Sequence, residues 1–411
     1  MYQKPKGTRD LLGRELQRLE ALNAAARAFF GQNGYEEIRT PTFEFAALFD
    51  RSIGETTDIV EHEIYKFEVN KKLYALRPEG TASVLRAFIE NKLRLPVRFL
   101  YLWSMYRRER PQKGRYREFL QIGIELLGES KPFYDADIIE RGKQYLQSVG
   151  ARDFTIELNS IGCPECREAY RRTLEDYLQP NLSRLCDDCR RRFERNFLRI
   201  FDCKKESCQR LYDDAPKITD KLCGECAQHY VDVKKYLRYF GVDYVENKKM
   251  VRGLDYYTRT VFEFKHGELG AQDTIIAGGR YDLLMRELGG PDTPCIGWAL
   301  GPERLLLTMP EELPSVKARR AFFLIGVGER YLPTMISLRT QIHNNGHRCF
   351  LGDPGEPIKH QMKKADRFKA DHVVICGEDE EKEGIYTVKE MSTGRQSKIP
   401  VAEFESFLIH A

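Results

Sequence analysis

Eight of the eleven cysteines lie in one stretch of the chain and form four close pairs. The pairs are Cys163 with Cys166, Cys186 with Cys189, Cys203 with Cys208, and Cys223 with Cys226. Thiolates at this spacing are typical ligands of structural zinc, so two pairs could make one tetrahedral site and four pairs could make two. Pairing the first with the second and the third with the fourth is simplest, and interleaving is the alternative.

The same cysteines have a second interpretation, as reduced thiols buried like small apolar residues or left over from a metal-binding ancestor. A disulfide framework is disfavoured because the polar start of the chain is not a signal peptide. No apolar run approaches the roughly 20 residues that span a bilayer. We therefore expect a cytoplasmic protein.

On either side of the cysteine-rich stretch the pattern is that of a sheet with helices. Residues 98–108 and 116–127 read as two long strands around a basic loop, and strands return at residues 251–264. Thr8 or Asp10 can cap an N-terminal helix with one apolar face, made of Leu12, Leu16, Leu19, Leu22, Ala26 and Phe29. The sequence thus predicts an α+β fold, an antiparallel sheet flanked by helices, interrupted by a helical insertion.

The last 90 residues alternate short apolar strands with helices, which predicts parallel strands in a small α/β domain. Strands are expected at residues 322–327, 347–351 and 372–376, with helices at 330–345 and 357–370 between them. The predicted domains are residues 1–162 and 248–314 for the two parts of the sheet domain, 163–247 for the Cys-rich insertion and 321–411 for the C-terminal domain.

The basic loop between the two long strands carries the first chemical signal. The chain lacks a Gly-x-x-x-x-Gly-Lys phosphate loop, so nucleotide chemistry would need side-chain cations. Arg107 and Arg115 could approach one ligand from either side of a hairpin, and arginine binds phosphate in a bidentate manner. Phe119 could stack on a base. The alternative is a solvated basic hairpin.

These residues resemble motif 2 of class II aminoacyl-tRNA synthetases, through Tyr106-Arg107-x-Glu109 and Arg115-x-x-x-Phe119. Residues 297–304 resemble motif 3, and residues 34–41 resemble motif 1, which builds the dimer interface in that class. Residues 251–260 and 277–282 look like the two histidine-specific motifs of histidyl-tRNA synthetases. The resemblance implies a class II synthetase fold with a C-terminal anticodon-binding domain. It also implies a homodimer that uses ATP with Mg²⁺, L-histidine and tRNA(His).

The resemblance also implies roles for single residues. Arg107 and Arg252 are the expected catalytic residues at the α-phosphate, with Arg252 in the place that a metal ion takes in other class II enzymes. The expected histidine-binding residues are Glu79, Gly80, Thr81, Arg107, Gln121, Glu125, Arg252, Tyr256 and Tyr257. The expected ATP-binding residues are Arg107, Glu109, Arg115, Phe119 and Arg304. Because a site that hydrogen-bonds its substrate rejects analogues without editing, the insertion is expected to assist tRNA binding.

Candidate tRNA contacts come from two sources. Arg110 and Gln112 match family positions near the acceptor end of the tRNA. Arg191 and Arg195 follow from the residues alone, because residues 190–199 read as one amphipathic helix with a basic face that could track a phosphate backbone. That face could equally be solvated and paired with nearby acids. The net charge of +4 neither requires nor excludes a nucleic-acid partner.

Two other functions compete with the ligase. One is a non-catalytic relative, such as the synthetase-like regulatory subunit of histidine biosynthesis, which lacks the anticodon domain and loses active-site residues. The other is a zinc-dependent RNA-binding module, which would leave Arg107, Arg252 and Arg304 without a role. The zinc prediction itself depends on cysteine spacing, since insertions in the family commonly lack these residues.

Overall fold

The computed structural model describes residues 2–53, 62–112, 114–195, 197–270, 273–309 and 320–410. The chain forms two compact units. The first contains residues 1–19, 38–237 and 242–312, and the second contains residues 20–37, 238–241 and 313–411. Within the described ranges, none of the helices has both the length and the apolar character needed to span a bilayer.

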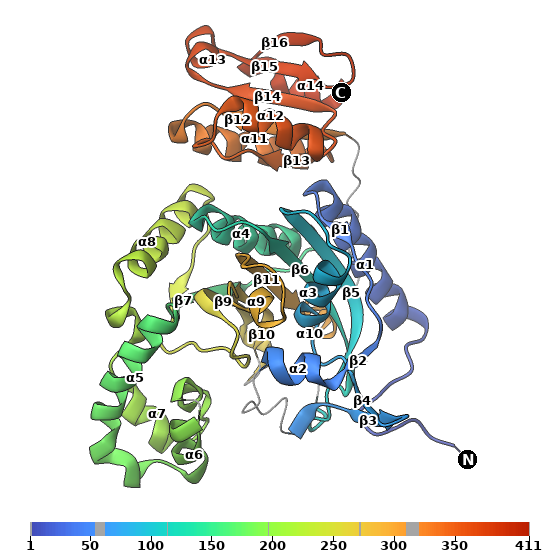
Figure 1. Ribbon diagram of the computed structural model, residues 1–411. Helices are drawn as coiled ribbons and strands as arrows, with labels where there is room; N and C mark the ends of the chain where they lie inside the picture. The colour runs from blue at the N-terminus through green and yellow to red at the C-terminus, as the bar shows by residue number, and fades with distance from the viewer. Residues whose placement is uncertain are drawn as a thin grey trace. The chain divides into compact units, whose positions relative to one another are not determined.

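An eight-stranded sheet has the order β1-β5-β6-β11-β10-β9-β7-β8, and its strands from β5 through β8 form the centre of the first unit (Figure 1). Its strands are β1 Glu36–Glu37, β5 Val97–Tyr106, β6 Glu118–Leu127, β7 Phe154–Ser160, β8 Val245–Glu246, β9 Thr258–His266, β10 Thr274–Arg280 and β11 Cys295–Leu300. The pairs from β5 through β7 are antiparallel, and β8 joins β7 in parallel. The predicted antiparallel sheet flanked by helices is confirmed.

Helices cover this sheet, and a small sheet β2-β4-β3 lies beside it. Trp298 on β11 donates its Nε1–H to the Ile138 carbonyl of α4 at 3.1 Å, which fixes that helix on the sheet. The first helix begins at Gly13, and Leu12 is 75% exposed, so the predicted cap and its apolar face were wrong at that end. The elements are α1 Gly13–Gln32, α2 Ala46–Ile53, α3 Thr81–Glu90, α4 Pro132–Ser148, α9 Leu284–Glu287, α10 Pro302–Leu307, β2 Phe43–Phe45, β3 Lys66–Val69 and β4 Lys72–Leu76.

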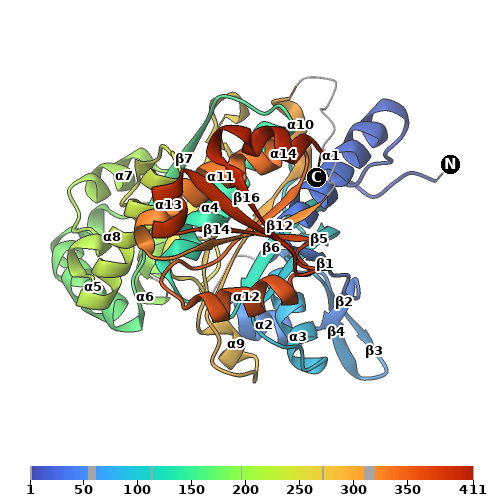
Figure 2. The same ribbon diagram turned by 90° about the horizontal axis from the view of Figure 1, so that it is seen from above.

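The cysteine-rich stretch is a helical lobe on one side of the sheet in both views (Figures 1 and 2). It contains α5 Pro164–Leu178, η2 Gln179–Arg184, α6 Asp187–Arg195, η3 Phe197–Asp202, α7 Glu206–Asp213, η4 Ile218–Lys221 and α8 Gly224–Tyr239. Its core is continuous with that of the sheet domain, since Ile200 and Cys208 belong to one buried cluster with Tyr256 and Tyr257.

The helix predicted over residues 190–199 is shorter than expected. Helix α6 ends at Arg195, and the chain continues at Phe197 as a 3-10 helix. Arg199 is consequently buried and pairs with Asp202 at 2.9 Å. It therefore does not extend the exposed basic face on which Arg191 lies.

The second unit contains a five-stranded sheet in the order β13-β12-β14-β15-β16. The three predicted strands are parallel, and β15 and β16 add an antiparallel edge that was not predicted because its residues lack a continuous apolar run. Figure 2 shows α12 on one face of this sheet and α11 with α14 on the other. The elements are β12 Ala321–Gly326, η6 Glu329–Tyr331, α11 Leu332–Asn344, β13 Arg348–Leu351, α12 Ile358–Arg367, β14 His372–Cys376, α13 Glu378–Glu383, β15 Ile385–Glu390, β16 Gln396–Pro400, η7 Val401–Glu403 and α14 Phe404–His410.

Candidate active site

A cavity of about 510 Å³ lies in the first unit, bounded by strands of the large sheet, the start of α3, the segment before β9 and the insertion. It gathers most of the residues that the sequence predicted for histidine and ATP. The predicted residues on its wall are Glu79, Thr81, Arg107, Glu109, Arg115, Phe119, Gln121, Arg252, Tyr256, Tyr257 and Arg304. Two others, Gly80 and Glu125, are buried just behind the wall.

Glu79, which lies just before helix α3, makes one end of the cavity acidic. The carboxylate of Glu79 accepts the backbone N–H groups of Thr81 at 2.6 Å and Ala82 at 2.9 Å. It thereby satisfies donors that a helix start otherwise leaves exposed. Burial raises the pKa of Glu79, while these hydrogen bonds and the Arg107 charge act in the opposite direction. An ammonium group is the natural partner for a carboxylate held in this way.

Glu125 lies deeper, on β6, and accepts a hydrogen bond from the Thr81 hydroxyl at 2.7 Å. The hydroxyl of Tyr281 donates to its other oxygen. Burial raises the pKa of Glu125 to about 8, although both hydroxyls act to lower it. A side chain at Gly297 would overlap this carboxylate, so the glycine is required for Glu125 to lie where it does.

Tyr281 is a site residue that the sequence prediction missed. It lines the cavity, contacts Glu125 and has its ring centroid 5.6 Å from that of Tyr256. Tyr256 in turn lies 4.8 Å from Tyr257, so three tyrosines surround this end of the cavity. The only signal in the sequence was its place inside the motif of residues 277–282, to which no role for this tyrosine was assigned.

Besides Oε2 of Glu109, which is in an ion pair with Arg115, two polar atoms on the cavity wall are buried without a hydrogen-bond partner among the residues that the structure describes. They are Oε1 of Gln121 and Nε of Arg252. An isolated buried donor or acceptor costs about 1–3 kcal/mol, and a bound ligand can remove that cost. Because one atom is an acceptor and the other a donor, the site suits a ligand with both a cationic and an anionic group.

The other end of the cavity is rich in arginine. Arg107 donates from Nε to the Pro78 carbonyl at 2.9 Å, and its guanidinium lies 5.3 Å from the Phe119 ring centroid. Arg304 donates to the carbonyls of Gly114 at 3.3 Å and Thr274 at 3.1 Å. These carbonyl contacts orient the guanidinium groups without neutralising them.

Two further arginines are paired with carboxylates. Arg115 forms an ion pair with Glu109, and Arg252 forms one with Glu263, a partner that the sequence prediction missed. Burial lowers the pKa of Arg252, but the Glu263 charge outweighs it and the net shift is upward. Burial and the neighbouring Arg115 lower the pKa of Arg304. These four arginines, together with Arg192 on the same wall, favour a ligand with several negative charges, such as a polyphosphate.

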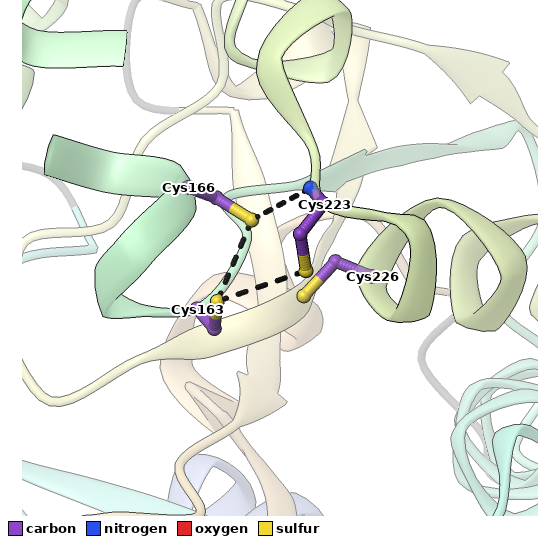
Figure 3. Close-up of side chains that lie close together, drawn as sticks. All are labelled: Cys163, Cys166, Cys223 and Cys226. Atoms are coloured by element: carbon purple, nitrogen blue, oxygen red, sulfur yellow. Dashed lines mark hydrogen bonds between the residues drawn. The ribbon is translucent and has the colours of Figure 1, made fainter. Parts of the chain in front are cut away.

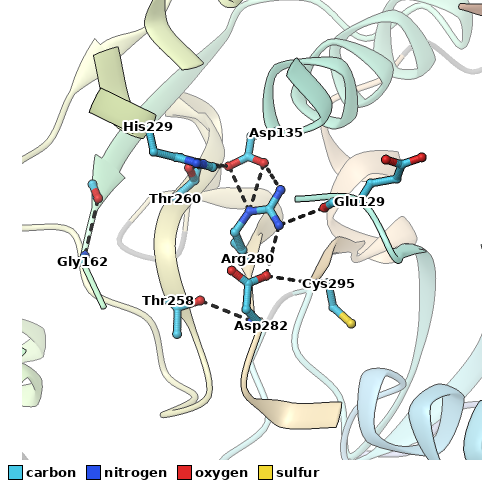
Figure 4. A network of polar contacts seen from close by, with 10 residues as sticks. Glu129, Asp135, Gly162, His229, Thr258, Thr260, Arg280, Asp282 and Cys295 are labelled. Atoms are coloured by element: carbon cyan, nitrogen blue, oxygen red, sulfur yellow. Dashed lines mark hydrogen bonds and ion pairs between the residues drawn. The ribbon is translucent and has the colours of Figure 1, made fainter. Parts of the chain in front are cut away.

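A buried polar network includes Arg280 and Asp282 of the segment 277–282 (Figure 4). Arg280 donates to Asp135 from Nε at 3.1 Å and contacts it again through Nη2, and it donates to Asp282 at 3.0 Å. His229, from helix α8 of the insertion, lies 2.7 Å from Asp135. The Arg280 charge holds the pKa of Asp135 well below its usual range despite burial. The network fixes the residue that precedes Tyr281.

The cysteines form two clusters, and their pairing is nested. Cys163, Cys166, Cys223 and Cys226 form one group, so the first pair joins the fourth (Figure 3). The simplest pairing along the sequence is therefore wrong. The reason is topological: Cys163 follows β7, where the chain leaves the sheet, and Cys223 precedes α8, through which the chain returns.

The second and third pairs form a distal cluster of Cys186, Cys189, Cys203 and Cys208. In each cluster all sulfur atoms lie within 4.8 Å of one another. Tetrahedral zinc with Zn–S bonds of about 2.3 Å separates its sulfurs by about 3.8 Å. The distances between sulfur atoms, 3.5 Å for Cys163 with Cys166 and 3.9 Å for Cys186 with Cys203, agree with that geometry. Either cluster could hold a metal ion.

The predicted tRNA residues lie outside the cavity wall. Arg110 and Gln112 are exposed on the loop between β5 and β6, where Gln112 and Arg115 exchange backbone hydrogen bonds of 3.1 and 2.9 Å. Arg191 is exposed on α6 and pairs with Asp188, and Arg195 ends that helix.

Comparisons with known proteins agree with this geometry. Residues 7–305 match the family described as histidyl-tRNA synthetase, and residues 321–410 match the anticodon-binding domain. The match over 321–410 is contrary to the regulatory-subunit alternative, which predicted that this domain would be missing.

Full-length relatives give the same result. The chain is 44% identical to the histidine–tRNA ligase of Halothermothrix orenii over 97% of this chain and 96% of that one. It is 43% identical to the histidine–tRNA ligase of Aquifex aeolicus over 98% and 99%. The crystal structure of apo S. aureus histidyl-tRNA synthetase superposes with a TM-score of 0.60 at 31% identity, covering the whole of both chains.

Proposed function

The chain belongs to the histidyl-tRNA synthetase family, and we propose that its cavity binds histidine at the acidic end and ATP at the arginine-rich end. As a member of this family it is an ATP-dependent ligase. It activates histidine to the adenylate with release of pyrophosphate and then transfers histidine to the 3′ end of its tRNA.

The histidine end is proposed from the paired groups described above. Glu79 and Gln121, which both lie on the cavity wall, bind the α-ammonium group of the substrate. Glu125 lies behind Thr81 and, together with Tyr256 and Tyr257, forms the pocket for the imidazole. The imidazole has one donor and one acceptor nitrogen, and a carboxyl group with hydroxyl neighbours can satisfy both.

The nucleotide end is proposed from its charges. Phe119 and Glu109 bind the adenine, while Arg115 and Arg304 bind the β- and γ-phosphates. ATP enters with Mg²⁺ as its usual counter-ion.

Chemistry at the α-phosphate follows from Arg107 and Arg252. A carboxylate oxygen of histidine attacks the α-phosphorus, the bond from that phosphorus to the bridging oxygen breaks, and pyrophosphate leaves. Fixed cations on either side stabilise the charge that develops in this step, which is usually the largest catalytic contribution. In the second step a ribose hydroxyl of the tRNA attacks the histidine carbonyl and AMP leaves.

This assignment depends on the buried Oε1 of Gln121, which has no hydrogen-bond partner in the described part of the chain, at one end and on the group of arginines at the other. Substituting Gln121→Met should raise the KM for histidine about tenfold or more and leave the KM for ATP unchanged, because it removes a hydrogen bond to a charged group. Arg304→Gln should raise the KM for ATP and leave the KM for histidine unchanged. Glu118→Gln, an exposed change at the start of β6, is the control. Equal effects of both variants on both substrates would contradict the assignment.

We also propose that each cysteine cluster holds one structural zinc ion. Four sulfur ligands leave no open coordination position, so the ions would stabilise the insertion and take no part in the chemistry. The cluster of Cys163, Cys166, Cys223 and Cys226, called the proximal cluster, would join the two ends of the insertion at its base. The distal cluster would hold α6 and α7 together.

For tRNA, we propose that Arg110 and Gln112 contact the acceptor end and that Arg191 and Arg195 contact its backbone. Substituting Arg191 and Arg195 together should weaken tRNA binding and flatten its dependence on salt, because fewer counterions are released. An unchanged salt slope would remove these two residues from the proposal. The cytoplasmic location remains a prediction.

A homodimer is proposed from motif 1 and from an exposed apolar face on the small sheet. Phe43, Phe45, Phe67 and Val69 are each between 38% and 54% exposed on β2 and β3, and Tyr74 of β4 pairs in register with both Phe45 and Phe67 on the same face. Contiguous exposed apolar side chains of this kind mark a protein interface more often than open surface.

A further inference from the structure

The insertion contributes part of the catalytic cavity. Arg192, Asp202 and Lys204 belong to the wall of that cavity together with Arg107, Arg252 and the other residues of the proposed site. No motif of the sheet domain includes these three residues. The insertion therefore supplies charged groups within the space where the substrates react.

Lys204 is the most accessible of the three. It is exposed, and its charge acts on the nearby Asp202 carboxyl group, which is already ion-paired with Arg199. Because Asp202 has this other partner, the exposed ammonium group of Lys204 can also reach a ligand. Arg192, half-buried on α6, adds a second positive group on the same wall.

The position of Lys204 points to the phosphate end of the cavity. Lys204 also lines a neighbouring groove of about 890 Å³, whose wall includes Arg304, Thr274 and Glu263. Arg304 is bound to Thr274, and Glu263 is the partner of Arg252. Lys204 therefore lies on the side of the cavity that contains Arg304 and the ion pair of Arg252 with Glu263.

The distal cysteine cluster determines where Lys204 can lie. Lys204 follows Cys203 directly in sequence, and the sulfur of Cys203 accepts the backbone N–H of Lys205 at 3.4 Å. Sulfur atoms of Cys186 and Cys203 are 3.9 Å apart, which joins this segment to the start of α6. Arg199 pairs with Asp202 and lies beside Gly253, the neighbour of Arg252.

We propose that Lys204 binds the phosphate chain of ATP and that the distal four-cysteine site, through its metal ion, holds this lysine in place. This inference rests on the proposed function of the cavity. It makes the insertion a part of the activation site, in addition to any contact with tRNA.

Lys204→Met tests the first half, with Lys205→Met as a matched control. Lys205 is the adjacent exposed lysine and is not part of the cavity wall. In histidine-dependent exchange of pyrophosphate into ATP, Lys204→Met should raise the KM for ATP about tenfold, as expected for a charge-assisted contact with phosphate. The KM for histidine and the zinc content should stay unchanged, and Lys204→Arg should restore most of the affinity for ATP.

Identical ATP constants for Lys204→Met and Lys205→Met would overturn the inference. So would a change in the KM for tRNA alone, which would place Lys204 on the acceptor end of the tRNA. Failure of the proposed function is distinguishable from both results, because the wild-type chain would then show no histidine-dependent exchange.

The second half is tested by removing the distal ion. Cys208→Ser should lose one metal equivalent by elemental analysis and raise the KM for ATP, and combining it with Lys204→Met should add little further effect. Cys163→Ser, in the proximal cluster, should lose one equivalent without this change in ATP binding. If Cys208→Ser does not fold, equilibrium ATP binding by the intact chain before and after chelation replaces it, with Lys204→Met insensitive to chelation. If the effects of Cys208→Ser and Lys204→Met on the KM for ATP add fully, or if ATP binding is unchanged after the ion is lost, the metal ion does not hold Lys204 in place.

Discussion

Glu125 is a buried carboxyl group that has no cationic partner among the residues described. Its position depends on Thr81, Tyr281 and Gly297. On β11, Gly297 pairs in register with Glu125 of β6 and with Gly279 of β10. Because Gly297 has no side chain, the Tyr281 hydroxyl reaches across this strand to Glu125. The sequence predicted Glu125, but the role of Tyr281 depends on strand order, which no local pattern contains.

Burial of Glu125 should make folding stability depend on pH. Its pKa in the folded chain is raised to about 8, above the ordinary value of 4.5. Below pH 4.5 the carboxyl group is neutral in both the folded and the unfolded chain, and its contribution to stability is fully present. Between pH 4.5 and 8 the unfolded chain releases the proton while the folded chain retains it, so this contribution is lost as the pH rises through 8. Each pKa unit corresponds to about 1.4 kcal/mol, so the wild type should lose a few kcal/mol relative to Glu125→Gln between about pH 5 and 8. Chemical denaturation of both proteins measures this, and parallel stability curves would contradict it.

The ion pair of Arg280 with Asp135 gives a second prediction. Both side chains are fully buried, so removing Arg280 leaves the Asp135 charge without its arginine partner, while its contacts with His229 and Thr260 remain. Arg280→Met should lower the free energy of unfolding by about 3–5 kcal/mol. Arg286→Met, in an exposed pair only six residues away, should lower it by less than about 1 kcal/mol. Thermal unfolding distinguishes them, and equal losses would show that the buried network does not stabilise the fold.

Among the elements, the insertion departs most from what its residues indicated. The helical character of residues 163–247 was predicted from composition, and so were the four cysteine pairs. Their nested pairing was not, because it depends on β7 and α8 meeting at the base of the lobe. The early end of α6 has the same origin, since the chain must turn to bring Cys203 back to Cys186.

Metal content measures the pairing directly. If the clusters are nested, the double variant of Cys163 and Cys223 to serine damages one site and should lose one zinc ion of the two. Substituting Cys163 and Cys186 together damages both sites and should lose both ions. Pairing in sequence order would give the opposite for the second variant, with one ion retained. Elemental analysis of the purified proteins decides between them.

At the scale of the molecule, the order of domains was readable because each has its own pattern of strands and helices. The antiparallel edge of the second sheet was not, since β15 and β16 are only partly buried. Dimerisation belongs to the scale of the molecule, because it depends on a surface whose partner lies outside the chain.

The exposed face of the small sheet provides a test of the dimer. Placing a charge there with Phe45→Glu should convert the protein from dimer to monomer in sedimentation velocity, because a charge in an apolar interface is costly. Val401→Glu, at a similarly exposed apolar residue of the second unit, should leave the dimer intact. A Phe45→Glu protein that sediments like the wild type would exclude this face as the interface.

Exchange of labelled pyrophosphate into ATP tests the central claim most directly, because it reports adenylate formation without tRNA. With the purified wild-type chain, histidine alone among the amino acids should support exchange. Arg252→Gln should reduce the rate by about 100-fold or more, as loss of a fixed group at the reacting centre typically does. Exchange that is absent, that other amino acids support equally, or that survives Arg252→Gln unchanged would contradict the account.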